Sequence, residues 1–194
     1  MNIIDKIKQA FGRGPLLSQD QISRFSLLPK DQARKEFCDT AYELCAKRAA
    51  EFVKRELGRA DSPYQGLSSA ALYHEILVVT FWLMDKAAAD GKNAFLDDLH
   101  EHYFRSHSAP EGSREERQKG LSGKYEQYED FWNEITGHFD EFGLCVVRNL
   151  FGTGESSRTR ERTFWIIQYA DETIQAFSPL RKVSKKLFSL PPSS

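Results

Sequence analysis

Apolar residues recur every three or four positions along most of the chain, a spacing that places them on one face of an α-helix. The most regular stripe runs through residues 123–151, and a second long one runs through residues 31–57. The first stripe consists of Tyr125, Tyr128, Trp132, Ile135, Phe139, Phe142, Val146 and Leu150. No alternation of polar and apolar residues is long enough to indicate a sheet. The pattern therefore predicts an all-α protein with two long amphipathic helices.

The segment between these stripes is apolar on nearly all sides. Residues 76–84 read Ile-Leu-Val-Val-Thr-Phe-Trp-Leu-Met, with Ser68 or Ser69 placed as a helix cap and Gly91 as a helix breaker. A helix without a polar face is expected in the middle of a core. We therefore predict one domain, residues 1–194, in which an irregular multi-helix bundle places the two long amphipathic helices around a central apolar helix.

Shorter helices complete the expected bundle. They are predicted over residues 18–28, over residues 93–105 and between Ser156 and Pro179. The last of them should present an apolar face made of Phe164, Ile167, Ala170, Ile174 and Phe177. Residues 106–123 are polar and contain glycine, so we expect an exposed loop there.

Length and composition fit a stable globular chain. The 194 residues, of which 40% are hydrophobic, are enough to bury a core without a disulfide or a metal. The cysteines Cys38, Cys45 and Cys145 form no Cys-x-x-Cys pair, so we expect reduced thiols and no zinc ribbon. The chain begins without a signal-peptide pattern, and residues 70–84 fall short of the roughly 18 apolar residues of a membrane-spanning helix. These features favour a cytoplasmic protein.

The net charge of −1 is unevenly distributed along the chain. Residues 1–13 carry a net charge of +2 and residues 179–194 carry +4, which leaves −7 for the rest of the chain. Contact with nucleic-acid phosphates needs clustered Lys and Arg on the folded surface. An acidic body with two basic ends therefore argues against a nucleic-acid-binding protein.

An ionisable pair, His74 and Glu75, lies on the predicted central helix. Burying such a pair is costly unless it is hydrogen-bonded or lines a cavity. We therefore take the pair as a candidate ligand site or polar core site, with aromatic side chains such as Tyr73 and Trp82 beside it. The commoner alternative is that Glu75 favours the positive end of the helix and His74 bonds a backbone carbonyl, so that both are satisfied within the fold.

The histidine-rich segment of the next helix fits a metal site only in part. Asp97 and His100 have the i,i+3 spacing of carboxylate-bridged metal bundles, but no second copy of the motif occurs. His100 and His102 would point about 200° apart on a helix, so they could not hold one ion. We expect a solvated helix edge here and no metal.

Motifs for nucleotide binding and nucleophilic catalysis are missing from the sequence. The segment from Gly120 to Lys124 lacks the earlier glycine of a phosphate-binding loop, because Gln118 occupies that position. No Gly-x-Ser-x-Gly motif occurs, and no cysteine pairs with a particular histidine. We therefore expect no cofactor, and the sequence favours a protein without catalytic activity.

Both ends of the chain form amphipathic segments with basic residues on the polar face, over residues 2–12 and residues 180–190. Helices of this kind lie on anionic membranes or dock into a groove of a partner protein. The alternative is that each packs its apolar stripe on the bundle and directs its charges to water. The candidate docking or membrane face consists of Ile3, Ile4, Ile7, Phe11, Lys182, Val183, Lys186 and Leu187.

These patterns lead to three hypotheses about function. The leading one is a non-catalytic helical module that binds another protein, with one or both ends as docking elements. The second is peripheral attachment to an anionic membrane through the basic ends. The third is a ligand-binding or enzymatic bundle with a cavity near His74 and Glu75. Because the apolar stripe of a long helix can close a monomer core or a dimer interface, a homodimer is a further alternative.

Overall fold

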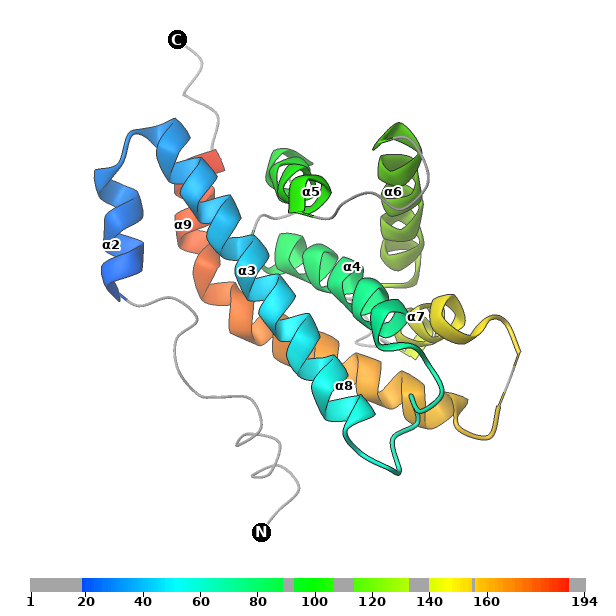
Figure 1. The fold of residues 1–194 in the computed structure, drawn as a ribbon. Helices are drawn as coiled ribbons and strands as arrows, with labels where there is room; N and C mark the ends of the chain where they lie inside the picture. The colour runs from blue at the N-terminus through cyan, green and yellow to red at the C-terminus, as the bar shows by residue number, and fades with distance from the viewer. Residues whose placement is uncertain (1–18, 89–92, 107–113, 133–139, 155, 189–194) are drawn as a thin grey trace.

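The computed structural model describes residues 19–88, 93–106, 114–132, 140–154 and 156–188, and the regular structure in these ranges is helical. The all-α bundle predicted from the sequence is confirmed (Figure 1). Its elements are α2 (Gln19–Leu27), α3 (Lys30–Leu57), α4 (Ser69–Ala88), α5 (Asn93–Ser106), α6 (Arg114–Phe131), α7 (Asp140–Phe151), α8 (Thr159–Phe177), the 3-10 turn η1 (Ser178–Leu180) and α9 (Arg181–Phe188).

Helix α4 lies in the middle of the bundle and is buried without interruption from Glu75 to Asp85. Helices α3 and α8 pack along it, and α5, α7 and α9 also contact it. Figure 1 shows α3 alongside α4, with α8 and α9 behind α3 in that view. The helix begins at a serine cap, because the Ser68 hydroxyl accepts a 3.1 Å hydrogen bond from the backbone N–H of Ala71. The apolar sequence of α4 thus corresponds to a core helix.

Helix α3 has the length and the buried stripe expected for residues 31–57. Its backbone ladder continues to Gly58, whose N–H donates to the carbonyl of Lys54 at 3.1 Å. The stripe residues Ala33, Phe37, Ala41, Cys45, Ala49 and Phe52 are all buried. The small side chains in this stripe allow the helix to lie close to its neighbours.

The second long helix, expected over residues 123–151, does not form as one element. Helix α6 ends at Phe131, and Trp132 is not helical. A separate helix, α7, spans Asp140–Phe151, and residues 133–139 lie outside the described range. The aromatic spacing persists across the break because residues on both sides of it pack in one core. The ring centroids of Trp132 and Phe142 lie 5.2 and 5.3 Å, respectively, from that of Trp82. The sequence pattern therefore resembled that of one continuous helix because residues from both helices pack in the same core.

The loop expected over residues 106–123 is also corrected. Residues 114–123 form the first half of α6, whereas residues 107–113 lie outside the described range. This half of the helix is mostly exposed, although Leu121 is buried. Its polar composition and its glycines resemble those of a loop, because a surface helix with a narrow apolar face gives a weak periodic signal.

The basic segment near the C-terminus packs on the bundle as α9. Leu180, Ser184 and Leu187 are buried, and the ring of Phe188 contacts Phe37 and Phe95 at centroid distances of 6.2 and 5.3 Å. The segment over residues 2–12 lies outside the described residues. Within the described part of the chain, none of the helices combines the length and apolarity needed to cross a membrane.

Candidate functional site

Glu75 is the buried centre of a polar network that joins three helices. The residue is 3% exposed on α4. Its Oε1 atom accepts hydrogen bonds from the Tyr128 hydroxyl at 2.8 Å and from Nδ2 of Asn149 at 3.0 Å, and Oε2 is paired with the ammonium of Lys124. Donors on both carboxylate oxygens offset the loss of hydration. The network therefore ties α6 and α7 to α4.

Of the other members of the sequence-predicted site, His74 and Tyr73 point away from Glu75, whereas Trp82 lies about two turns along nearly the same side of α4 and packs on Tyr128. His74 is exposed, and its Nδ1 atom lies 2.9 Å from the hydroxyl of Tyr103. Tyr73 is half-buried, and Trp82 is buried in the aromatic core. Adjacent residues on a helix point about 100° apart, which explains why this pair does not converge. The partners of Glu75 come from distant helices, and no local sequence signal indicates them.

His100 is buried, contrary to the solvated helix edge expected for this segment. It is 6% exposed, its ring stacks on Tyr125 with centroids 5.4 Å apart, and Nε2 lies 2.8 Å from the Tyr125 hydroxyl. Burial lowers the pKa of His100 to about 4. His102 is half-buried and pairs with Asp39 at 2.8 Å. The two histidines therefore diverge as expected, but α6 covers one of them.

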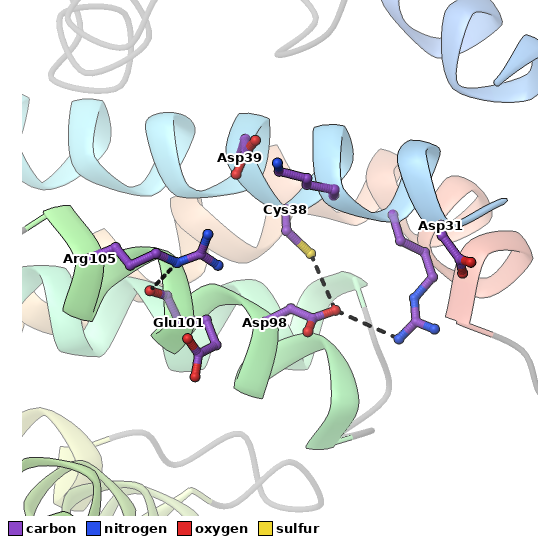
Figure 2. Close-up of a pocket in the computed structure, with 8 residues that line it drawn as sticks. Asp31, Cys38, Asp39, Asp98, Glu101 and Arg105 are labelled. Carbon is purple, nitrogen blue, oxygen red and sulfur yellow. Dashed lines mark hydrogen bonds and ion pairs between the residues drawn. The ribbon is translucent and has the colours of Figure 1, made fainter. Parts of the chain in front are cut away.

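A pocket of about 340 Å³ lies between α3 and α5, away from Glu75. Figure 2 shows Asp31, Cys38 and Asp39 on α3 facing Asp98, Glu101 and Arg105 on α5. Arg34 and Lys35 complete its lining. Both signs of charge are therefore interleaved around a polar opening.

The charged groups of this pocket largely compensate one another. Arg34 pairs with Asp98 at 3.6 Å, and Nε of Arg105 donates to the backbone carbonyl of Glu101 at 3.2 Å. The thiol of Cys38 lies 4.0 Å from Asp98. Burial, reinforced by the charge of Asp98, raises the pKa of this thiol far above its ordinary value. A thiol that stays protonated is a poor nucleophile.

A different feature stands out at the opposite end of α3, where the loop before α4 meets the start of α8. The hydroxyl of Tyr64 donates to the carbonyl of Arg162 at 2.7 Å, and Nε of Arg162 donates to the carbonyl of Pro63 at 2.8 Å. Arg158 donates to the carbonyls of Asp61 and Ser62. These reciprocal bonds fix the first turns of α8 on a rigid base.

An aromatic pair, Phe164 and Trp165, lies on the surface just after these turns. Phe164 is 57% exposed, and Trp165 is half-buried beside it with ring centroids 5.5 Å apart. The guanidinium groups of Arg55 and Arg59 lie 5.6 and 5.4 Å from the Trp165 ring centroid. Among the described residues, only Phe164 and Leu27 are large hydrophobic side chains with such exposure. We call the outward face of α8 around Phe164 the α8 face.

The sequence pattern misassigned Phe164 to the buried side of its helix. Of the predicted face, Ala170 and Phe177 are buried and Ile167 and Ile174 are half-buried, but the buried side also contains Tyr169 and Thr173, whose hydroxyls are bonded inside the core. The Tyr169 hydroxyl lies 2.5 Å from Oγ1 of Thr80, and Nε of Arg48 donates to Oγ1 of Thr173 at 2.8 Å. Because these polar residues are satisfied by other helices, the buried face could not be located from apolar spacing alone.

The candidate docking residues near the C-terminus divide between core and surface. Leu187 is buried and Val183 is half-buried, so the apolar side of α9 lies against the bundle. Lys182 and Lys186 are exposed, as are Arg181 and Lys185. The candidates Ile3, Ile4, Ile7 and Phe11 lie outside the described residues. The exposed side of α9 is therefore a positively charged face.

Comparisons with protein-family models, curated proteins and solved structures returned no match. In the described ranges, no group of three or more His, Cys, Asp or Glu side chains is arranged to hold a metal ion. The α8 face combines the exposed Phe164 with a half-buried tryptophan and two arginines.

Proposed function

We propose that this protein is a non-catalytic helical interaction module that binds a protein partner through the α8 face. The observation that carries the proposal is the exposure of Phe164 on a helix whose other apolar side chains are buried or half-buried. Burying a phenylalanine side chain fully is favourable by about 1.5–3 kcal/mol. With 57% of the residue exposed, a partner that covers Phe164 would gain a substantial part of that free energy.

The surroundings of Phe164 have the composition of a binding hot spot. Tryptophan and arginine are enriched among residues that dominate interface energetics. Trp165 and the arginines above its ring, Arg55 and Arg59, provide these residue types beside Phe164. Arg55 and Arg59 are also paired with Glu56 and Asp61, which restrains their side chains. A restrained surface loses little conformational entropy on binding.

The base beneath the α8 face is rigid as well. The Tyr64 hydroxyl donates to the carbonyl of Arg162, and Arg162 donates in turn to the carbonyl of Pro63, which joins the α3–α4 loop to α8. The Arg162 guanidinium lies 3.6 Å from the Phe151 ring centroid. This brings α7 into the same assembly. A partner would meet a surface that is already in place, and we expect little rearrangement of α8 on binding.

The test compares two exposed hydrophobic residues. Phe164→Ser removes the proposed anchor, and Leu27→Ser removes an even more exposed residue, 85% accessible, at the other end of the molecule. Chemical cross-linking and affinity capture with the full chain as bait should lose the captured protein with Phe164→Ser and retain it with Leu27→Ser. Equal capture by both variants would remove the α8 face from consideration.

A second function, attachment to an anionic surface, is favoured by the charged face of α9. Arg181, Lys182, Lys185 and Lys186 are exposed on one short helix. Since the apolar side of α9 is packed on the bundle, such attachment would be electrostatic and would weaken with salt. Each basic residue near an anionic surface contributes about 1 kcal/mol.

Vesicle cosedimentation distinguishes this second function from protein binding. Phosphatidylserine vesicles should sediment the full chain at low salt, and Lys182→Glu combined with Lys186→Glu should release it, whereas Phe164→Ser should not. Equal sedimentation with neutral phosphatidylcholine vesicles would contradict an electrostatic mechanism.

A further inference from the structure

We propose that the partner of the α8 face is a second copy of this chain, bound so that the two α8 helices pack antiparallel around a two-fold axis. The inference rests on the proposed function and names its partner. It is carried by the order of side chains along α8: Arg160, Phe164 and Asp171 are exposed, and they occur in that order along the helix.

These side chains share one narrow face. At about 100° per residue, Arg160 and Asp171 fall within about 40° of Phe164, on the side of α8 opposite to the buried Thr173. Gln175 lies on the same face, and its Nε2 atom donates to Asp171 at 2.9 Å. The face therefore has a cation at one end, an aromatic ring nearer the middle and an anion at the other end.

Such an order is complementary to itself when one copy is reversed. If the two-fold axis passes between Trp165 and Ile166, Arg160 and Asp171 are equally far from it. Arg160 of each copy then lies level with Asp171 of the other, which forms two equivalent ion pairs. The two Phe164 residues flank the two-fold axis, about 4.5 Å apart along the direction of the helices at 1.5 Å per residue. Both rings are covered in this arrangement.

The charge pattern favours a second copy over an unrelated acidic or basic segment. A uniformly acidic partner would neutralise Arg160 and be repelled by Asp171, and a uniformly basic one would do the reverse. A reversed copy satisfies both charges at once. A single helix pair is small for an interface, so we expect a reversible dimer that forms at high micromolar concentration.

Charge reversal and charge exchange test the pairing. In sedimentation equilibrium of the full chain, Arg160→Asp and Asp171→Arg should each weaken the dimer by about tenfold or more, because each places like charges opposite one another. The double variant exchanges the two charges, and dimerisation should return to near the wild-type affinity. Restoration of this kind is expected only if the two residues meet across the interface.

Two further variants separate this inference from the proposed function. Phe164→Ser should abolish the dimer, and Leu27→Ser should leave it unchanged. A wild-type chain that stays monomeric up to about 1 mM, or a double variant that fails to recover, would overturn the dimer. If the chain is monomeric and protein capture still depends on Phe164, the proposed function stands with a different partner. If capture is also insensitive to Phe164→Ser, both fail.

Discussion

The hydroxyl of Tyr128 on α6 donates a 2.8 Å hydrogen bond to the buried carboxylate of Glu75 on α4, across 53 residues of sequence. Tyr128 is fully buried, although most of its helix is exposed. Lys124, one turn earlier on α6, reaches the same carboxylate. Two residues of α6 therefore hold this helix against α4 through one acidic side chain.

Removing either side of this contact should destabilise the fold. Tyr128→Phe should lower the free energy of unfolding by about 1.5–3 kcal/mol, because a buried carboxylate loses a donor. Glu75→Ala should lower it by about 3–5 kcal/mol, because Lys124 and its neighbours lose their acceptor. Urea unfolding at pH 7 measures both values. Glu126→Ala on the exposed side of α6 is the control and should stay within about 0.5 kcal/mol.

The buried imidazole of His100 should make the protein acid-sensitive. Its pKa is about 4 in the folded chain because burial disfavours the charged form, whereas the ordinary value is 6.5. The unfolded chain binds the proton more readily, so this contribution to stability is complete above pH 6.5 and is lost as the pH falls toward 4. The loss is at most about 3 kcal/mol. Denaturation at a series of pH values gives the free energy of unfolding as a function of pH. Between pH 6.5 and 4 its slope should be smaller for His100→Gln than for the wild-type chain, and an unchanged slope would refute the assignment.

Asp85 should have the opposite pH dependence. It is 6% exposed, and its Oδ1 atom has no hydrogen-bond partner among the described residues. Burial raises its pKa to about 7 from the ordinary 3.8. Stability is therefore lost as the pH rises from 4 through 7, because folding opposes ionisation. Asp85→Asn should stabilise the protein at pH 8 by about 2–4 kcal/mol and have little effect at pH 4. A gain that is equal at both pH values would contradict this account.

Two glycines should respond in opposite directions to alanine. A Cβ atom at Gly143 on α7 would lie 2.8 Å from Cγ1 of Ile167 and 3.0 Å from the backbone oxygen of Thr163, both on α8. Gly143→Ala should therefore cost about 1–3 kcal/mol by separating the two helices. Gly120 on α6 has open space at the same position, so Gly120→Ala should add about 0.5–1 kcal/mol through helix propensity. A higher melting temperature for both variants would show that backbone propensity alone is acting.

The sequence by itself determined the all-α class, because helical periodicity is a local property that each segment expresses on its own. Helices α3 and α4 were predictable for this reason: their apolar residues lie within the segments, and their capping and terminating residues lie a few positions beyond the ends. The same reasoning joined α6 and α7 into one helix, since Trp132 and Phe142 pack on the same ring, that of Trp82, and keep a common spacing.

Only the tertiary structure decided which polar residues are buried and which apolar ones are exposed. Glu75 was recognisable as unusual, yet its donors arrive from α6 and α7. Thr173 occupies the core because Arg48 satisfies its hydroxyl, and the buried side of α8 is turned accordingly. That rotation leaves Phe164 in solvent. Partners far away in the sequence set the orientation of a helix, and a local pattern cannot contain them.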